Sequence, residues 1–300
     1  MAPPQRPPFG FRALMAALLV ASLGVVAWRG GVFGSLVGAR RASTVLAGNT
    51  AGRPVRAAKA ALLPPLAPVS RDPEGDLEAV QRYVQMGYPL YCGGGKGKFV
   101  ALTFDDGPGP YTTRTLEILR NAKARATFFL VGRNLGWYHG LAEQEAPDNA
   151  VGDHTWTHAY LTKLTVADQQ HEIDSTRQAV AAATAGQVVL FRPPGGFHNA
   201  SIDHLVASLG MLQTMWSVDS MDSKGATTRE VLANVIAGLH PGAIILMHEN
   251  RGTTLQMLPR FLRTVANQGY QTVTVPELLR LDPPSAEQIR TNATLGDCVA

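Results

Sequence analysis

The sequence is poor in cysteine and has no cysteine pair at the spacing of a metal or redox motif. Its 300 residues include only Cys92 and Cys298, and no Cys-x-x-Cys occurs. A multi-disulfide scaffold and a zinc site built from thiolates are therefore excluded. With 45% hydrophobic and 17% charged residues, the composition is that of a folded globular protein and not of a disordered chain.

Acidic residues are absent from the first 71 positions, which hold nine basic residues. The rest of the chain has 18 basic and 23 acidic residues, so it is mildly acidic although the whole chain carries +4. The basic character belongs to an N-terminal arm. Because the phosphate backbone of nucleic acids attracts basic surfaces, we expect no nucleic acid as a partner of the globular part.

The sequence also lacks an uncharged apolar run of about 20 residues, the usual length of a membrane-spanning helix. The longest candidate is residues 13–28, between Arg12 and Arg29, which is longer than the apolar core of most signal peptides. We interpret residues 1–29 as an uncleaved membrane anchor. The alternative is a cleaved signal peptide, which would leave a secreted protein. With either an anchor or a signal peptide the chain leaves the cytoplasm. Arginine outnumbers lysine 21 to 6, as in GC-rich bacteria. We therefore expect an extracytoplasmic location in a bacterial cell envelope.

Four further segments follow the anchor. Residues 30–76 are rich in Gly, Ala and Pro without periodicity, which predicts a flexible linker. Residues 77–96 are expected to form an opening helix, capped by Asp76, and a lead-in segment. Residues 97–281 form the main domain, and residues 282–300 a C-terminal tail.

Apolar runs alternate with amphipathic segments throughout the main domain. This alternation predicts an α/β fold with a parallel sheet that closes into a barrel. The expected strands are residues 99–104, 126–131, 150–152, 188–191, 212–218, 243–247 and 271–275. The expected helices are residues 113–121, 165–184, 201–209, 227–238 and 254–268.

Polar residues follow directly after most of the predicted strands. The carboxyl ends of the strands in a parallel barrel lie on one rim, where active sites are built. We therefore expect these side chains to meet there, although each motif alone also fits an ordinary turn, a surface histidine or a structural salt bridge. The residues are Asp105, Asp106, His154, His158, Arg192, Asp219, Asp222 and His248.

Two of these histidines have a spacing that suits metal binding. His154 and His158 are four residues apart, and we expect a helical turn that brings both imidazoles to one face. Asp106 offers a third ligand, which would leave open positions for water as in a catalytic zinc site. A metal-dependent phosphoesterase is disfavoured, because such enzymes usually recruit more ligands for two metals and the sequence offers one set of three.

Five motifs occur in a fixed order: TFDDGP at 103–108, HTWTH at 154–158, RPPGG at 192–196, DSMD at 219–222 and LMH at 246–248. Together they resemble the polysaccharide deacetylases with a NodB homology domain, carbohydrate esterase family 4. The resemblance covers roughly residues 97–280 and implies a deformed (β/α)7-type barrel. It also implies hydrolysis of acetyl groups with a divalent metal, zinc in the first place and cobalt as the alternative.

The resemblance implies roles for the first three motifs. By motif position, Asp105 is expected to be the general base, with Arg192 as its partner. Asp106, His154 and His158 are expected to be the metal ligands. These roles fit the chemistry, since a divalent metal polarises a poorly reactive amide and a neighbouring carboxylate accepts a proton from water.

The remaining motifs imply an acid and a binding pocket. His248 is expected to be the general acid, oriented by Asp222. The main-chain amide of Gly195 is expected to contribute to the oxyanion hole, and Leu246 to line the acetyl-methyl pocket. Two positions depart from the family pattern, since Gly195 stands where the family often has Tyr and Ser223 where it often has Trp. The first departure removes an aromatic wall, and the second removes an apolar side of the acetyl pocket. Both affect substrate fit more than the reacting groups.

The expected substrate is the N-acetylglucosamine of peptidoglycan, because an anchor and a spacer favour a polymer near the cell surface. O-acetylated xylan and chitin are the alternatives within the family. A catalytically inactive polysaccharide-binding module is the alternative of another class. We expect the protein to act as a monomer.

The two cysteines are expected to form a disulfide. Cys92 precedes the first predicted strand and Cys298 lies near the end of the chain, and an exported protein meets an oxidising environment. The bond would tie residues 282–300 to the start of the main domain. The alternatives are two unpaired thiols, or a lipidated or intermolecular cysteine.

Overall fold

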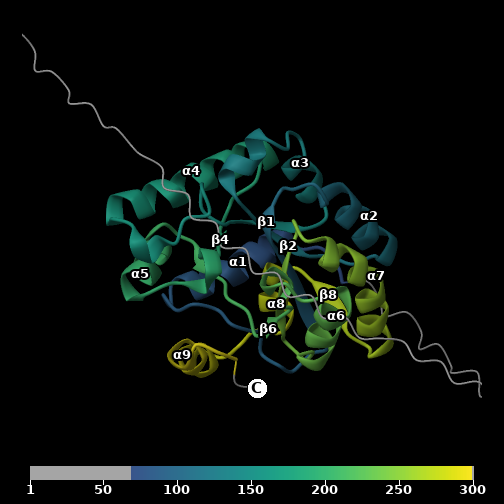
Figure 1. Ribbon diagram of the computed structural model, residues 1–300. Helices are drawn as coiled ribbons and strands as arrows, with labels where there is room; N and C mark the ends of the chain where they lie inside the picture. Colours follow the sequence, from purple (N-terminus) through teal and green to yellow (C-terminus); the bar gives the residue numbers. More distant parts are fainter. Residues whose placement is uncertain (1–68, 299–300) are drawn as a thin grey trace, which may run out of the picture. The chain divides into compact units, whose positions relative to one another are not determined.

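Residues 69–298 are described by a computed structural model of the protein (Figure 1). The predicted anchor, residues 1–29, and all but the last part of the predicted linker lie outside the described residues. Within residues 69–298, no helix combines the length and the apolar character needed to cross a membrane.

The opening helix α1, Pro73–Val84, begins earlier than expected. The side chain of Asp72, and not that of Asp76, caps it by accepting a hydrogen bond from the amide of Gly75. Proline is favoured in the first turn because its missing N–H would have no partner there. The last residues of the predicted linker are therefore helical.

The strands form one parallel sheet in which β1, Phe99–Gly107, is central. The order is β5-β4-β3-β2-β1-β7-β6, and β8 also pairs with β1. The other strands are β2 Thr127–Leu130, β3 Ala150–Asp153, β4 Leu190–Phe191, β5 Leu212–Gln213, β6 Val218–Asp219, β7 Ile244–His248 and β8 Gln271–Val273. The predicted α/β fold with a parallel sheet is confirmed.

The sheet is a curled half-barrel and not the closed barrel expected from the sequence. Strands β5 and β6 are the two ends of the order and do not pair. The lead-in segment runs between the β5 edge and the start of β7: Leu90 pairs with Thr214 after β5, and Cys92 pairs with Ala243 before β7.

The apolar run 212–218 was expected to form one strand, and it forms two. The amide of Thr214 still bonds the carbonyl of Phe191, whereas the amide of Ser217 bonds the carbonyl of Ile244. The chain thus leaves one edge of the sheet and joins the other within four residues. Periodicity alone does not reveal such a crossing, because no glycine or proline interrupts residues 212–218.

Helices pack on the convex face of the sheet. The principal ones are α2 Thr112–Ala122, α4 Val166–Thr184, α5 Ala200–Ser208, α6 Thr228–Ala237 and α7 Gly252–Asn267, all within two residues of expectation at each end. The short α3, Ala142–Glu145, and the 3-10 turns η1 Gly132–Gly136, η2 Leu161–Lys163, η3 Pro194–Gly196 and η4 Asp222–Lys224 were not expected.

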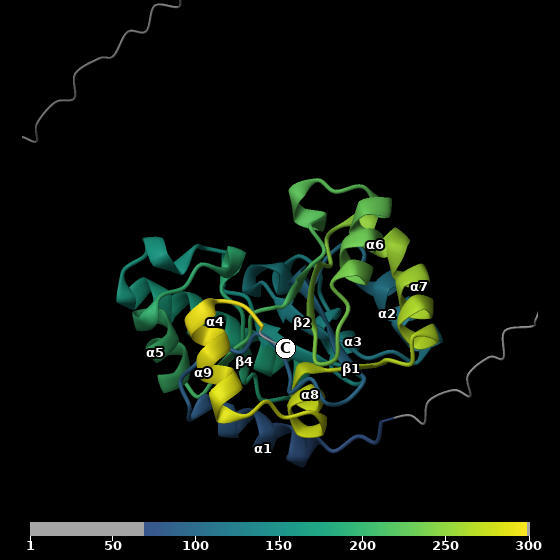
Figure 2. The ribbon, with the colours of Figure 1, turned by 90° about the horizontal axis from the view of Figure 1, so that it is seen from below.

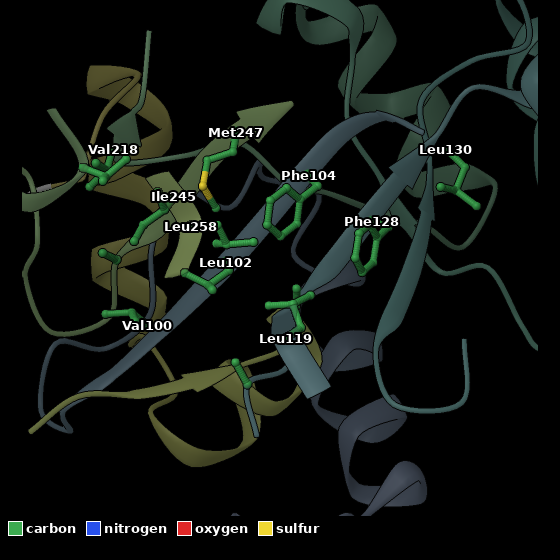
Figure 3. Packing of buried hydrophobic residues seen from close by; sticks show 14 of the residues in the cluster. Val100, Leu102, Phe104, Leu119, Phe128, Leu130, Val218, Ile245, Met247 and Leu258 are labelled. Atoms are coloured by element: carbon green, nitrogen blue, oxygen red, sulfur yellow. The ribbon is translucent and has the colours of Figure 1, made fainter. Parts of the chain in front are cut away.

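Side-chain alternation along β1 and β7 separates the core from the site. Val100, Leu102 and Phe104 point into the main core under the helices, together with Ile245 and Met247 (Figure 3). Successive strand residues point to opposite faces. The residues between them therefore face the concave side: Ala101, Thr103 and Asp105 on β1, and Ile244, Leu246 and His248 on β7.

A second, smaller core fills one end of the concave side. It includes Ala79, Val80 and Tyr83 of α1 and Leu278 of α8, Val275–Leu281. Helices α1 and α8 lie against each other at this end (Figure 2). The polar residues at the carboxyl ends of the strands thus lie at the opposite end of the sheet.

The predicted C-terminal tail contains a helix, α9, Ala286–Leu295. A capping box between Ser285 and Gln288 begins it. Beyond it, Cys298 forms a disulfide with Cys92, with a Cα–Cα distance of 5.8 Å. The bond ties the tail to the lead-in segment, as the sequence analysis expected.

Candidate active site

Asp105 and Arg192 form a buried ion pair at the carboxyl ends of β1 and β4. Arg192 Nη1 donates to Asp105 Oδ1 at 2.7 Å and to Thr103 Oγ1 at 2.8 Å. Its Nε and Nη2 donate to the main-chain carbonyls of Thr214 and Met215. A buried guanidinium requires such partners, because removing a charge from water is costly. The network fixes one oxygen of Asp105 and leaves Oδ2 for other contacts.

Asp106 reaches the same rim through an irregularity in β1. Neighbouring strand residues ordinarily point to opposite faces, but Asp106 has a left-handed φ of 69°, and the pairing with β2 shifts register between Asp105 and Gly107. Asn134 donates to the main-chain carbonyl of Asp106, and Asn250 donates to its Oδ2. The two asparagines hold Asp106 in this left-handed conformation, and neither was among the residues predicted from the sequence.

The HTWTH segment is a loop and not the helical turn that the spacing of its histidines predicted. Thr155 and His158 both have left-handed φ angles, 64° and 62°. The amide of Thr155 donates to Asp153 Oδ1, which closes a tight turn directly after β3. This turn, and not a helix face, brings His154 and His158 together, with ring centroids 5.0 Å apart.

Asp106, His154 and His158 form a cluster that can hold a metal. One ligand atom from each lies within 4.8 Å of the other two. His154 Nδ1 lies 2.7 Å from the main-chain oxygen of Arg192, which can only accept, so Nδ1 carries the proton and Nε2 keeps its lone pair. Two imidazole nitrogens and one carboxylate oxygen match the ligands of a catalytic zinc site with open positions. The residues therefore fit a divalent cation.

His248 is held by Asp222 at the end of β7. His248 Nδ1 donates to Asp222 Oδ1 at 2.6 Å, and the His248 amide donates to Oδ2 at 2.7 Å. Thr254 also donates to Asp222 Oδ2. His248 is the register partner of Asp105 on the adjacent strand. His248 Nε2 is thus available for proton transfer next to the Asp105 carboxylate.

The charges of the site shift the pKa values of its members in different directions. Burial lowers the pKa of His248, but the hydrogen bond that its ring donates to Asp222 and the charges of Asp105, Asp222 and Asp106 outweigh burial and raise it. Burial raises the pKa of Asp106, but the neighbouring histidines and Asn250 lower it overall. Burial and the charge of His154 lower the pKa of His158. A protonated His248 and a neutral His158 suit a proton donor and a metal ligand.

The two remaining predicted site residues flank the cluster. Leu246 is buried on the concave side of β7, two residues before His248. Gly195 lies in η3 with a φ of 65°. A side chain there would be strained, and its Cβ would lie 2.9 Å from the ring of Phe197 and 3.3 Å from that of Tyr160. The aromatic wall expected to be lost at Gly195 is replaced in space by these two rings.

A pair of buried acids beneath the site was not anticipated. Glu249 and Glu145 are both almost completely buried, and burial raises the pKa of each, that of Glu249 to about 7. Thr112 donates to Glu249 and also accepts from the amide of Gly109. The oxygens of Glu145 have no hydrogen-bond partner among the described residues, and besides burial the neighbouring charge of Glu249 raises the pKa of Glu145. Glu249 thus supports the loop after β1 through Thr112.

Known proteins are similar to this chain in sequence. A family model described as polysaccharide deacetylase matches residues 93–214. The peptidoglycan-N-acetylmuramic acid deacetylase PdaC of Bacillus subtilis is 34% identical over 183 residues, which are 60% of this chain and 38% of PdaC. A peptidoglycan-N-acetylglucosamine deacetylase of Bacillus cereus is 32% identical over 190 residues, 61% of this chain and 89% of that protein.

A solved structure shares the fold. A pseudoenzyme of the CE4 family from Bacillus anthracis has a TM-score of 0.61 and 32% sequence identity, covering 66% of this chain and 70% of that chain. The chain spans 38% of the length of the Bacillus subtilis relative, but 89% of the Bacillus cereus one.

Proposed function

This chain belongs to the polysaccharide deacetylase family, and from that premise we propose that it hydrolyses acetyl groups from a cell-surface polysaccharide. The observation that carries the proposal is the convergence of a three-ligand cluster, a buried carboxylate and a carboxylate-oriented imidazole at one end of the sheet. Each of the three parts serves amide hydrolysis, because the carbonyl is unreactive without polarisation, water attacks better when a base accepts its proton, and the amine leaves when it is protonated.

Asp106, His154 and His158 would hold the divalent cation, zinc in the first place. When bound, it supplies a Lewis acid for the acetyl carbonyl and the attacking water. The Nδ1–H of His154, fixed by the Arg192 carbonyl, keeps Nε2 directed to the cluster. Asn250 fixes the Asp106 carboxylate through the oxygen Oδ2.

Asp105 is proposed to accept the proton of the attacking water. Its Oδ1 is engaged by Arg192, so Oδ2 is the proton-accepting atom. Oδ2 lies 3.6 Å from His154 Nε2, on the side of the ligand cluster. A base positioned in this way deprotonates water as the water attacks the carbonyl carbon.

His248 is proposed to donate a proton from Nε2 to the departing sugar amine. Asp222 binds Nδ1 and favours the protonated ring, as the raised pKa of His248 indicates. The amide of Gly195 would stabilise the developing oxyanion, and Leu246 would contact the acetyl methyl group. The divalent cation and the main-chain amide would together stabilise the negative charge of the oxyanion.

The proposed polymer is peptidoglycan, and its N-acetylglucosamine is the proposed sugar. The Bacillus cereus relative is named for this sugar and the Bacillus subtilis relative for N-acetylmuramic acid. Both act on a wall polymer by name, which also supports action outside the cytoplasm.

The test is to incubate the purified, zinc-loaded protein in parallel with peptidoglycan, chitin oligosaccharides and acetylated xylan, and to measure deacetylated products by mass spectrometry. Loss of acetyl from the glucosamine of peptidoglycan supports the proposal. Loss only from xylan or chitin assigns the substrate to those alternatives. No turnover of any substrate, with the metal verified as bound, contradicts catalysis and leaves a binding module.

A further inference from the structure

Two exposed aromatic rings lie side by side next to the metal-ligand cluster. Phe197, which follows η3, is 53% exposed, and Tyr160, which precedes η2, is 39% exposed. Their ring centroids are 5.1 Å apart in an edge-to-face arrangement. Exposed aromatic groups that adjoin one another are unusual on a protein surface unless they bind something.

The pair is continuous with the candidate active site. The Tyr160 ring also contacts the ring of His158, a proposed metal ligand, with centroids 6.4 Å apart. Gly195, the proposed oxyanion donor, lies beneath both rings, within 3.3 Å of each from its ideal Cβ position. A polymer whose acetyl group reaches the cluster must therefore pass beside these rings.

The loop that carries Phe197 is anchored on both sides, although two glycines with positive φ lie before it. Gly196 packs directly on the ring of Trp216, which leaves no room for a side chain. On the other side, His198 Nδ1 lies 2.8 Å from Asp203 Oδ1, and its Nε2 lies 3.3 Å from the hydroxyl of Tyr91. The position of Phe197 is thus fixed in advance of binding, which reduces the entropy lost when a ligand binds.

Tyr160 is fixed in the same way. The Lys163 ammonium group lies over its ring, 5.2 Å from the centroid. Lys163 covers one face of the Tyr160 ring, and Phe197 packs against the same ring. Phe197 is the more exposed residue of the pair. Phe197 is therefore the principal contact that the pair offers to a ligand.

We propose that Phe197 and Tyr160 form a subsite for a pyranose ring next to the sugar that loses its acetyl group. This inference rests on the proposed function, since the proximity to the cluster determines which ligand is expected. A pyranose has one face of C–H groups, which packs on an aromatic ring, while its hydroxyls stay in water. The absence of a side chain at Gly195 is what allows the two rings to meet there.

The test measures binding without turnover. In the zinc-loaded Asp105→Asn protein, which lacks the proposed base, calorimetry gives the Kd of the tetramer of β-1,4-linked N-acetylglucosamine. Adding Phe197→Ala is expected to raise this Kd roughly tenfold, the equivalent of one aromatic contact. Adding Phe197→Tyr is expected to restore binding, and Phe197→Leu is not, because leucine keeps an apolar side chain but no flat ring.

The matched control is Tyr88→Ala. Tyr88 is 41% exposed, close to the value for Tyr160, and it lies on the lead-in segment after α1. Its removal is expected to leave the Kd unchanged. An unchanged Kd in Phe197→Ala, an equal loss in the control, or no measurable binding of the tetramer would each overturn the subsite.

Turnover by the protein with Asp105 intact separates the two proposals. With the same tetramer, Phe197→Ala is expected to raise KM more than it lowers kcat. If the protein with Asp105 intact deacetylates nothing but the tetramer still binds through Phe197, the proposed function fails and the subsite stands. If turnover is normal and Phe197→Ala changes neither KM nor Kd, the subsite fails alone.

Discussion

His154 Nδ1 lies 2.7 Å from the main-chain oxygen of Arg192, while the side chain of the same arginine donates to Asp105. One residue therefore orients a proposed metal ligand through its main chain and the proposed base through its guanidinium. The two functions can be separated by mutation, because a substitution removes the side chain and keeps the carbonyl.

Arg192→Met is expected to keep the metal and to lose most turnover. The Arg192 side chain is fully buried, so its removal leaves Asp105 without a partner and is expected to cost about 3–5 kcal/mol of stability. Misplacement of the base is expected to lower kcat by roughly a hundredfold. The measurement is zinc stoichiometry together with kcat on folded protein. The assignments are contradicted if the folded variant loses zinc while the molecules that still hold zinc turn over as fast as the unmodified protein.

The rate is expected to depend on pH in a bell shape whose alkaline limb reports His248. The pKa of His248 is raised above its usual 6.5, so the limb is expected above that pH. Asp222 is one cause of the raised pKa. Asp222→Asn should therefore move the alkaline limb of kcat/KM to lower pH, and His248→Gln should remove that limb and lower the rate by roughly 10²–10⁴-fold. An unmoved limb in both variants would identify another group as the acid.

The buried acid pair is expected to make stability fall as pH rises. The pKa of Glu249 is about 7 in the folded protein against an ordinary 4.5, so the folded state binds more protons than the unfolded state between these values. The free energy of unfolding should fall across this interval by an amount on the order of 3 kcal/mol. Glu249→Gln is expected to weaken this dependence of the unfolding free energy on pH, as measured by urea unfolding at several pH values.

Glu78→Gln is the control for the acid pair, because Glu78 is exposed on α1. It should leave the dependence of stability on pH as in the unmodified protein. If Glu249→Gln leaves the dependence of the unfolding free energy on pH unchanged, other groups cause that dependence.

The disulfide is expected to stabilise the domain. It closes a loop with a sequence separation of 206, for which chain entropy gives an upper figure of about 5 kcal/mol. Cys298→Ser should lower the unfolding free energy, and reduction of the unmodified protein should have the same effect. If both thiols alkylate without a reductant, the bond is absent from the protein in solution.

The sequence predicted which side chains come together better than it predicted the backbone that brings them there. Motif order brought Asp106, His154 and His158 together correctly, because the carboxyl ends of parallel strands meet at one rim. The helical turn expected for HTWTH was wrong, since spacing does not reveal two residues with positive φ. The split of residues 212–218 between β5 and β6 was also hidden, because no glycine or proline separates the two strands.

Other features had a sequence signal that was not used. The spacing of Ser285 and Gln288 is a capping box and marks the start of α9. Thr103 lies two residues before Asp105 in a strand, so alternation places both on one face. Asn250 and the Glu145 contact with Glu249 depend on tertiary packing between distant segments, which no local pattern contains.

The most direct test of the account compares deacetylation by metal-free and zinc-loaded protein, with the metal content verified. The account predicts no turnover without metal and recovery with zinc. It also predicts that His154→Ala loses the metal, that Asp105→Asn keeps the metal but not the turnover, and that His171→Ala, a change at an exposed histidine of α4, keeps both. Full activity in verified metal-free protein would contradict the account.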